Sequence, residues 1–295
     1  NFSTASLGTT GPDIVLSPND NLGVFVPGNL VQPIDTIVGA DFMKTLDAKT
    51  LEAGKFTGKQ YMIPDRNGNE VLVSYNKKLV KVPPKTFEEL EAMGLKLKKE
   101  GKVDYGLVFN EVEPFFSIGF LGAYGGKVFD DVNLASPKPT LNTPAVTQWM
   151  TFMKKIHSEG LIPKEADATV ADNLFKGGKS AFIINGPWGF ADYKKAGIDL
   201  GIMSIPTING KSPAPYSAVK GYTVSAGVKD ANKVAAVKKF LMFVNSKDAQ
   251  LKMVDAHQQI PTNLEAIKDA KITGNPLIAG QKDQLSKAKI GRAHV

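Results

Sequence analysis

Segments with the apolar pattern of a strand alternate along the chain with segments that have the apolar pattern of a helix. This alternation predicts an α/β protein. Segments with strand character are bounded by turn residues, and two of them flank Asn67-Gly68, a dipeptide typical of a tight turn. The segment Gly11–Leu16 predicts a turn that enters a buried strand. The other predicted strands are Lys59–Ile63, Glu70–Tyr75, Ser180–Asn185, Leu200–Ile205 and Thr223–Gly227.

Helical segments show apolar residues three and four positions apart and have identifiable ends. One helix has Thr86 as its N-cap, Glu89 as the capping-box partner and Gly101 as its stop. Another follows Thr143, with a proline at its first position. The predicted apolar face of that helix is Val146, Trp149, Met150, Met153 and Ile156. A third amphipathic helix is predicted over Asn232–Val244.

Composition sets the size of the protein and disfavours several classes of site. The chain has 295 residues, and a typical domain takes roughly 100–200, so two domains are predicted. The hydrophobic share of 42% and charged share of 22% fit a globular protein. Without cysteine, and with only three histidines, thiol catalysis, thiolate metal sites and His-based sites are disfavoured. No apolar run is long enough to predict a membrane-spanning helix.

The net charge of +7 raises the question of a nucleic-acid partner. The densest lysine cluster lies between Lys96 and Lys102, at the predicted end of a helix. The helix dipole favours cations at that position, and the other lysines are spread along the chain. We therefore expect no nucleic-acid partner.

Both ends of the chain look incomplete or altered. The chain opens at Asn1 without an initiator methionine or a signal peptide, so we expect its beginning to be missing. Residues Ile290–Val295 resemble the translation of a short-read sequencing adapter. We expect this segment to be a tail, and we exclude its histidine from the candidate sites.

The segment Gly177–Ser180 has some features of a phosphate-binding loop. Such a loop needs glycine where Asn173 stands, and it must lead from a strand into a helix. Here a helical segment precedes it and a strand follows. The segment therefore predicts a helix end and a turn.

Aromatic and acidic residues follow two predicted strands. Trp188 lies on a Gly-Pro turn after one strand, where its indole could stack on a sugar ring. Glu113 and Phe115 follow the apolar run Leu107–Phe109, and a carboxylate can accept hydrogen bonds from two neighbouring hydroxyls. Two structural alternatives remain open: Trp188 as a core residue, and Glu113 and Phe115 without a ligand role beside a solvated Glu111.

Polar pairs also lie near strand ends. Asp20-Asn21 follows the first predicted strand, and Asn69-Glu70 stands at the start of another. Ligands of open α/β sheets bind at strand ends, although an aspartate in such a place also serves as a helix cap.

Several segments together resemble the maltose-binding protein family, the sugar-binding components of bacterial ABC importers. In the order and spacing of that family stand Gly11–Val15, Tyr75–Lys77, Pro83–Glu89, Glu113–Phe116 and Ile184–Trp188. The resemblance extends to about Lys289.

The resemblance implies a type 2 periplasmic binding fold, with two α/β lobes, hinge strands and a ligand cleft between the lobes. The first lobe would comprise residues 1–70 and 223–289, without its opening strands. The second would comprise residues 71–222, without the last helices of the family, and residues 290–295 would be the tail. Hinges are expected near Gly68–Val71 and Val219–Tyr222.

The resemblance also implies a set of ligand-binding residues, with acids that bind sugar hydroxyls and aromatic side chains that stack on sugar rings. The set is Asp20, Asn21, Asn69, Glu70, Glu113, Phe115, Trp188 and Tyr222. Either Asn69 or Glu70 takes the place of a third acid. Ser17, Asn21 and Phe115 differ from maltose-binding protein, which favours another oligosaccharide or disaccharide of maltodextrin type.

We thus expect a non-catalytic, monomeric, periplasmic or extracellular protein, free or lipid-anchored, that delivers a sugar to a membrane permease. No cofactor or metal is expected. Two alternatives remain. Paired acids with aromatics also line glycosidase clefts, which would make the protein a glycoside-processing enzyme. Aromatic–acid clefts also hold cations, which would favour a non-sugar solute such as a polyamine.

Overall fold

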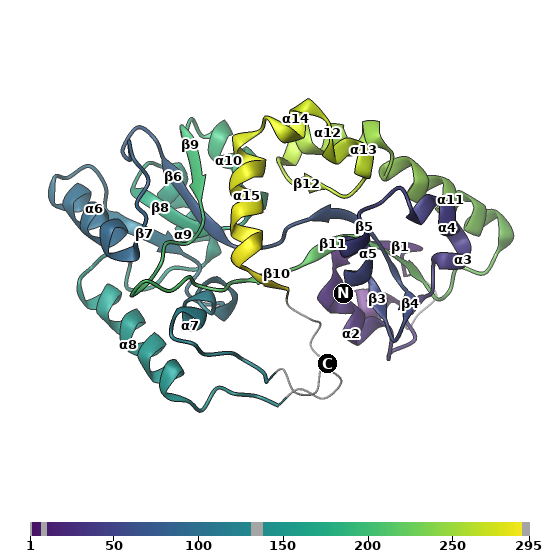
Figure 1. The fold of residues 1–295 in the computed structure, drawn as a ribbon, viewed down its shortest axis with the longest axis horizontal. Helices are drawn as coiled ribbons and strands as arrows, with labels where there is room; N and C mark the ends of the chain where they lie inside the picture. Colours follow the sequence, from purple (N-terminus) through teal and green to yellow (C-terminus); the bar gives the residue numbers. More distant parts are fainter. Residues whose placement is uncertain (1, 7–10, 131–137, 291–295) are drawn as a thin grey trace. The chain divides into compact units, whose positions relative to one another are not determined.

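The computed structural model describes residues 2–6, 11–130 and 138–290, and the contacts divide the chain into two units (Figure 1). Unit 1 contains the described residues before Glu70 together with Ala218–Ile278. Unit 2 contains Glu70–Ser217 and Ala279–Lys289. Residues 291–295 of the expected tail lie outside the described residues.

Unit 1 is built on an antiparallel sheet in the order β1-β11-β5-β12, and β2 also pairs with β11. Its strands are β1 Ile14–Pro18, β2 Val31–Gln32, β3 Lys55–Phe56, β4 Lys59–Gln60, β5 Met62–Asn67, β11 Val219–Ser225 and β12 Ile260–Pro261. Its helices are α1 Phe2–Ser6, η1 Asn19–Asn21, α2 Leu22–Phe25, α3 Asp35–Val38, α4 Ala40–Met43, α5 Ala48–Ala53, α11 Ala231–Val244, α12 Lys247–His257, α13 Leu264–Ile267 and α14 Ala270–Thr273.

The core of unit 1 joins its sheet to α3 and α11. Ile63 and Val224 of the sheet pack with Val237 and Leu241 of α11, and all four side chains are buried. Strand β1 is less buried than the sequence predicted, because Leu16 is 41% exposed. The apolar pattern of this strand is therefore not a measure of its burial.

Unit 2 is built on a sheet in the order β7-β8-β6-β9, in which only the β7–β8 pair, among the described pairings, is parallel. Its strands are β6 Leu72–Asn76, β7 Tyr105–Phe109, β8 Ser180–Asn185, β9 Leu200–Met203 and β10 Tyr216–Ser217. Its helices are α6 Phe87–Lys99, η2 Pro114–Phe116, α7 Gly119–Ala123, α8 Pro144–Ser158, α9 Ala168–Lys176, η3 Pro187–Gly189 and α10 Phe190–Lys195. Helix α15 Pro276–Lys287 and strand β13 Lys289–Ile290 cross from one unit to the other.

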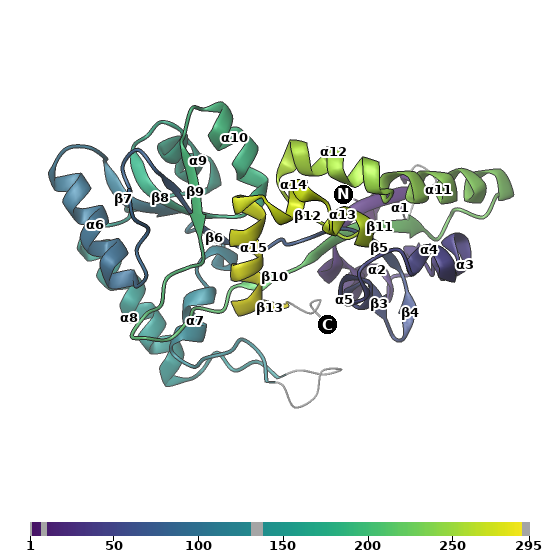
Figure 2. The same ribbon diagram turned by 45° about the horizontal axis from the view of Figure 1, so that its top comes forward.

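An aromatic core holds the helices of unit 2 against its sheet. The Phe87 ring of α6 makes edge contacts with Phe120 and Phe152, at centroid distances of 5.7 and 4.8 Å. Trp149 is buried, which confirms its predicted core role. Met150 is 45% exposed and was wrongly placed on the apolar face of α8; Phe152 is buried there instead. Figures 1 and 2 both place α6 beside β7 and α10 beside β9.

The predicted helix ends are largely confirmed. Thr86 Oγ1 accepts a hydrogen bond from the Glu89 backbone N–H at 3.2 Å, and Gly101 has a φ of +69°. The Glu89 carboxylate accepts from the backbone N–H of Lys85 at 2.7 Å, so the predicted capping box is shifted by one residue. Thr143 makes no side-chain cap bond. Gly177 ends α9 before β8, as predicted.

The two strands around the predicted Asn67-Gly68 turn do not pair with each other. Strand β5 pairs with β11 and β12 in unit 1, whereas β6 pairs with β8 and β9 in unit 2. The dipeptide therefore lies where the chain leaves one sheet for another, and it does not close a hairpin.

Two boundaries of the predicted lobes also change. Val219–Tyr222 was assigned to the second lobe, but this segment pairs with β1 and β5 of unit 1. Residues 279–289 were assigned to the first lobe, yet they pack on unit 2. There, the buried Gln284 side chain accepts a hydrogen bond from the Ile205 N–H at 2.7 Å, and Gly280 lies against Ile202. In the described part of the chain, no helix has both the length and the apolarity to cross a membrane.

Gly94 of α6 lies directly against β7. A Cβ at Gly94 would lie 2.8 Å from the Gly106 Cα and 2.9 Å from the Leu161 Cδ1. Helix propensity alone favours Gly94→Ala by about 1 kcal/mol, but overpacking costs about 1–3 kcal/mol. We therefore expect Gly94→Ala to lower the thermal midpoint. Ala92→Gly, at an exposed position of the same helix, measures the propensity effect alone. A Gly94→Ala protein that melts above the parent would contradict the close packing.

Candidate functional site

Half of the predicted ligand residues gather at one end of the sheet in unit 2. Phe109 pairs with Ile184 in parallel, and Leu72 pairs with Asn185 in antiparallel. The segments that follow β7 and β8, and the segment that precedes β6, therefore start from the same end of this sheet. The candidate residues on these segments are Glu70, Glu113, Phe115 and Trp188.

Phe115 and Trp188 form an aromatic pair. Their ring centroids lie 6.4 Å apart, with an interplanar angle of 35°. Trp188 is 37% exposed, which rules out the core alternative for this residue. Phe115 is half-buried and makes an edge contact with Phe116, whose side chain is buried in the core. The pair offers a partly exposed apolar surface that packs on the buried Phe116 ring. Such a surface suits the C–H face of a sugar ring.

The turn that carries Trp188 is held by a buried polar network that the sequence analysis missed. The Asn185 side-chain amide donates to Asp172 Oδ1 at 3.0 Å and to the Tyr193 hydroxyl at 2.7 Å. Its oxygen accepts from the Gly186 N–H at 2.8 Å. A Cβ at Gly186 would overlap the Trp188 ring. The network fixes the backbone of the turn, and Gly186 leaves room for the Trp188 indole. The asparagine before Gly-Pro was the sequence signal that could have indicated the network.

The two acids of this group differ sharply in environment. Glu113 is exposed at the start of η2. Glu70 is completely buried, and neither of its carboxylate oxygens has a hydrogen-bond partner in the described structure. Burial raises the pKa of Glu70 to about 8. A neutral carboxyl can both donate and accept a hydrogen bond, so Glu70 has unused capacity for both.

Glu111 is not the solvated residue that one alternative expected. Its carboxylate is largely buried and lies 2.7 Å from His157 Nε2. Burial, and secondarily the nearby Glu165, raise the pKa of Glu111 to about 7. Glu111 therefore supports the loop after β7 from within unit 2.

The remaining candidates lie in unit 1, and three of them are near one end of its sheet. Strand β1 ends with Pro18 paired to Lys220, and β5 ends with Asn67 paired to Val219. Asp20 and Asn21 follow the first of these strand ends, and Asn69 follows the second.

Asn19, which the sequence analysis did not single out, anchors the η1 turn that carries Asp20 and Asn21. Its Oδ1 accepts from the Val219 N–H at 3.1 Å, and its amide donates to the Ala53 carbonyl at 3.1 Å. The Asn21 amide donates weakly to the Pro18 carbonyl, at 3.4 Å. Asp20 Oδ1 is buried and has no hydrogen-bond partner in the described part of the chain. This oxygen is therefore a further unused acceptor.

Tyr222 lies within β11, three residues after the strand begins. It is half-buried, and its ring makes an edge contact with Phe240 at 5.4 Å. Burial raises the pKa of its hydroxyl. Among the described residues, no group of three or more His, Asp or Glu side chains could hold a metal ion.

The burial of Glu70 predicts a pH-dependent stability. Its pKa is about 8 in the folded protein against a usual value of 4.5, so the folded state holds a proton that the unfolded state releases. The neutral carboxyl therefore makes its full contribution to the free energy of unfolding below pH 4.5. This contribution is lost as the pH rises towards 8. We expect Glu70→Gln to gain stability over the parent between pH 5 and pH 8, by about 3–5 kcal/mol at most.

Thermal melting at a series of pH values measures this effect. Glu111 contributes to the pH dependence of both proteins, so the difference between them isolates Glu70. Glu113→Gln, at an exposed position, is the matched control. Its melting temperature should show no gain over the parent that increases with pH. A constant difference between Glu70→Gln and the parent across this range would show that Glu70 is ionised throughout.

Comparisons with known proteins agree with this architecture. The chain is 30% identical over 274 residues to the maltotriose-binding protein of Pyrococcus abyssi, covering 92% of this chain and 59% of the relative. It is 28% identical over 273 residues to the galactooligosaccharide-binding protein of Bacillus subtilis, covering 89% of this chain and 63% of the relative. The chain thus spans about three fifths of the length of these curated relatives.

A solved structure shows the same fold. The maltose/maltodextrin-binding domain from Bdellovibrio bacteriovorus, bound to maltotriose, superposes with a TM-score of 0.90 at 35% identity. The match covers 99% of this chain and 77% of that domain. The chain therefore has the two-lobe α/β fold of periplasmic maltodextrin-binding proteins.

The family match covers nearly the whole chain, from residue 3 to residue 280, under the description of bacterial extracellular solute-binding protein. Two separate α/β units, strand ends that carry acids and aromatics, and this match lead to one conclusion: the chain belongs to the bacterial extracellular solute-binding proteins.

Proposed function

We propose that this protein binds an oligosaccharide of maltodextrin type and delivers it to the membrane permease of an ABC importer. The observation that carries the proposal is the partly exposed Phe115–Trp188 pair at the same sheet end as the buried Glu70. The Bdellovibrio domain, whose structure holds maltotriose, supports the choice of ligand class.

The proposed contacts divide into two kinds. The aromatic pair covers the apolar face of a sugar ring. This contact buries apolar surface and engages the ring C–H groups without a charged side chain. The carboxyl oxygens of Glu70 and Asp20 take sugar hydroxyls, because each has an oxygen without a hydrogen-bond partner in the described structure. Glu113, Asn21, Asn69 and Tyr222 remain proposed contacts.

We propose that the protein has no glycosidase activity. Hydrolysis needs two carboxyl groups that flank one bond, one as acid and the other as base or nucleophile. In unit 2, Glu70 is buried whereas Glu113 is exposed, so the two acids differ in their access to a bond in solution. We further propose that the protein acts as a monomer outside the cytoplasmic membrane, free or lipid-anchored.

The chain passes between the units at several points, after Asn69, Ser217 and Ile278. We propose that the segment Gly68–Val71 acts as a hinge on ligand binding. The second expected hinge, Val219–Tyr222, is paired on both sides within the unit 1 sheet. The hinge on that crossing is therefore proposed just before this segment, at Ser217-Ala218.

Replacing the exposed tryptophan tests the site directly. We expect Trp188→Ala to weaken maltotriose binding by about 2–4 kcal/mol, or roughly 30- to 1,000-fold in Kd, with little change in melting temperature. Isothermal titration calorimetry measures the affinity, and a parallel assay for released glucose tests for turnover. Phe243→Ala, which removes an aromatic side chain that is 69% exposed on α11, is the matched control and should bind normally.

Gly186→Ala tests whether the position of the Trp188 indole is needed for binding. It should lower affinity by displacing the indole, and it should add little to Trp188→Ala in a double-mutant cycle. Normal binding by Trp188→Ala, or sugar hydrolysis by the parent, would contradict the proposed function.

The hinge proposal predicts a change in solution scattering. Saturating maltotriose should reduce the radius of gyration of the parent, because ligand contacts from both units favour a closed arrangement. Trp188→Ala at the same sugar concentration should stay close to its unliganded profile. Superimposable parent profiles, despite binding measured by calorimetry, would contradict the hinge.

A further inference from the structure

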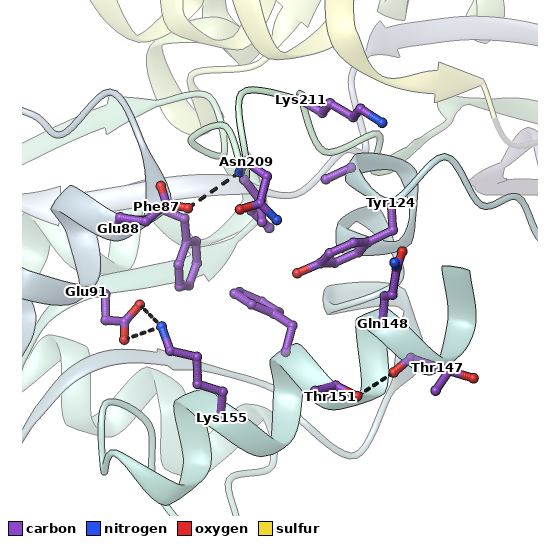
Figure 3. Close-up of a pocket in the computed structure, with 13 residues that line it drawn as sticks. Phe87, Glu88, Glu91, Tyr124, Thr147, Gln148, Thr151, Lys155, Asn209 and Lys211 are labelled. Atoms are coloured by element: carbon purple, nitrogen blue, oxygen red, sulfur yellow. Dashed lines mark hydrogen bonds and ion pairs between the residues drawn. The ribbon is translucent and has the colours of Figure 1, made fainter. Parts of the chain in front are cut away.

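Unit 2 contains a pocket that none of the candidate sugar-binding residues lines (Figure 3). Its volume is about 510 Å³, within the range of about 300–1,000 Å³ typical of small-molecule sites. Helices α6 and α8, the end of α7 and the turn Ile208–Lys211 form its walls. It is therefore independent of the group around Trp188.

A tight turn covers one side of this pocket. Ile208 and Lys211 exchange two backbone hydrogen bonds of 2.9 Å, and Asn209 and Gly210 between them have φ values of +50° and +73°. The Asn209 N–H approaches Glu88 Oε1 at 3.4 Å, which ties the turn to α6. The Asn209 side chain points into the pocket in Figure 3. The turn thus presents a neutral amide, which can donate and accept, to the space between the helices.

The charges that line the pocket balance. Lys155 Nζ lies 2.8 Å from both carboxylate oxygens of Glu91, and this contact raises the pKa of Lys155. Glu88 and Lys211 add one charge of each sign. The lining thus contains two carboxylates and two ammonium groups, a balance that favours neither an anion nor a cation. The pocket suits a neutral polar ligand.

The floor of the pocket is aromatic and its rim carries neutral polar groups. The Tyr124 and Phe152 rings lie 6.3 Å apart, and Phe152 packs on Phe87. In Figure 3 the Tyr124 hydroxyl points into the pocket, with Gln148 beside the ring. Within the described structure, no hydrogen bond engages the side-chain polar groups of Tyr124, Gln148 or Asn209. An apolar ring surface with free hydroxyl and amide groups matches the two faces of a sugar.

We propose that this pocket is a second binding site, for a neutral saccharide of one or two rings. The sugar packs on Tyr124, and its hydroxyls bond to the Tyr124 hydroxyl and to the amides of Gln148 and Asn209. The Glu91–Lys155 ion pair forms the opposite wall of the pocket. It offers charged hydrogen-bond acceptors and donors whose charges cancel. This inference does not rest on the proposed function, because the two groups of residues share no member.

The test uses the full chain with Trp188→Ala, so that binding at the proposed first site is strongly weakened. Glucose and maltose are titrated separately, and ¹H–¹⁵N spectra follow the backbone amides and the side-chain amides of Gln148 and Asn209. We expect saturable shifts at Tyr124, Gln148 and Asn209 with at least one of the two sugars.

Two variants in the Trp188→Ala background should weaken this binding. Tyr124→Phe keeps the ring and removes the hydroxyl, and Gln148→Ala removes the amide. Each should weaken binding about three- to ten-fold, as expected for one lost hydrogen bond. Lys154→Ala, at an exposed position of α8 outside the pocket, is the control and should leave binding unchanged.

The proposal is wrong if neither sugar shifts these resonances up to its solubility limit. It is also wrong if Tyr124→Phe and Gln148→Ala bind as tightly as Lys154→Ala. Failure of the proposed function would show itself elsewhere, as normal maltotriose binding by Trp188→Ala in calorimetry or as sugar hydrolysis.

Discussion

The candidate site in unit 2 depends on the way β8 pairs with both of its neighbours. Ile184 pairs with Phe109 on the parallel side, and Asn185 pairs with Leu72 on the antiparallel side. A slip of one residue in either register would turn the buried side chains of β8 to the opposite face. Because β8 is buried along its whole length, such a slip is strongly disfavoured. The positions of the loop after β7 and the turn after β8 follow from this pairing.

Within that frame, the site contains features that lower stability. A buried carboxyl without hydrogen-bond partners costs about 1–3 kcal/mol even when neutral, and Glu70 is such a group. Trp188 leaves more than a third of its surface in water, although an indole is among the side chains that gain most from burial. The proposed sugar would supply what both residues lack: hydroxyls for the carboxyl and an apolar face for the indole. The stability lost in the free protein is thus recovered in the proposed complex.

The sequence was most informative where a local chemical rule decides the structure. Thr86 and Gly101 mark the ends of α6 because capping and positive φ are local requirements. Long-range pairing was not accessible in this way. Asn67-Gly68 has the composition of a hairpin turn, yet the strands on its two sides belong to different sheets. Residues 279–289 pack on unit 2 through Gln284, whose side-chain contact no helical pattern indicates.

The candidate site was only partly predictable for the same reason. Trp188 stands on a Gly-Pro turn after an apolar strand, and its exposure could be expected from that context. The place of Asn185 before Gly-Pro was a local signal as well, but its partners Asp172 and Tyr193 could not be predicted, because the contacts of this network join residues up to 21 positions apart.

The neutral sugar of the proposed function gives this positioning network its importance. A net charge of +7 attracts anions over long distances but has no such effect on an uncharged sugar. Several of the lysines lie instead in the last turn of α6, where they offset the helix dipole. Recognition of the proposed sugar would therefore come from short-range contacts, whose strength falls off steeply with distance. Under that constraint, the hydrogen bonds of Asn185 would contribute to the proposed binding by holding the turn that positions the Trp188 indole.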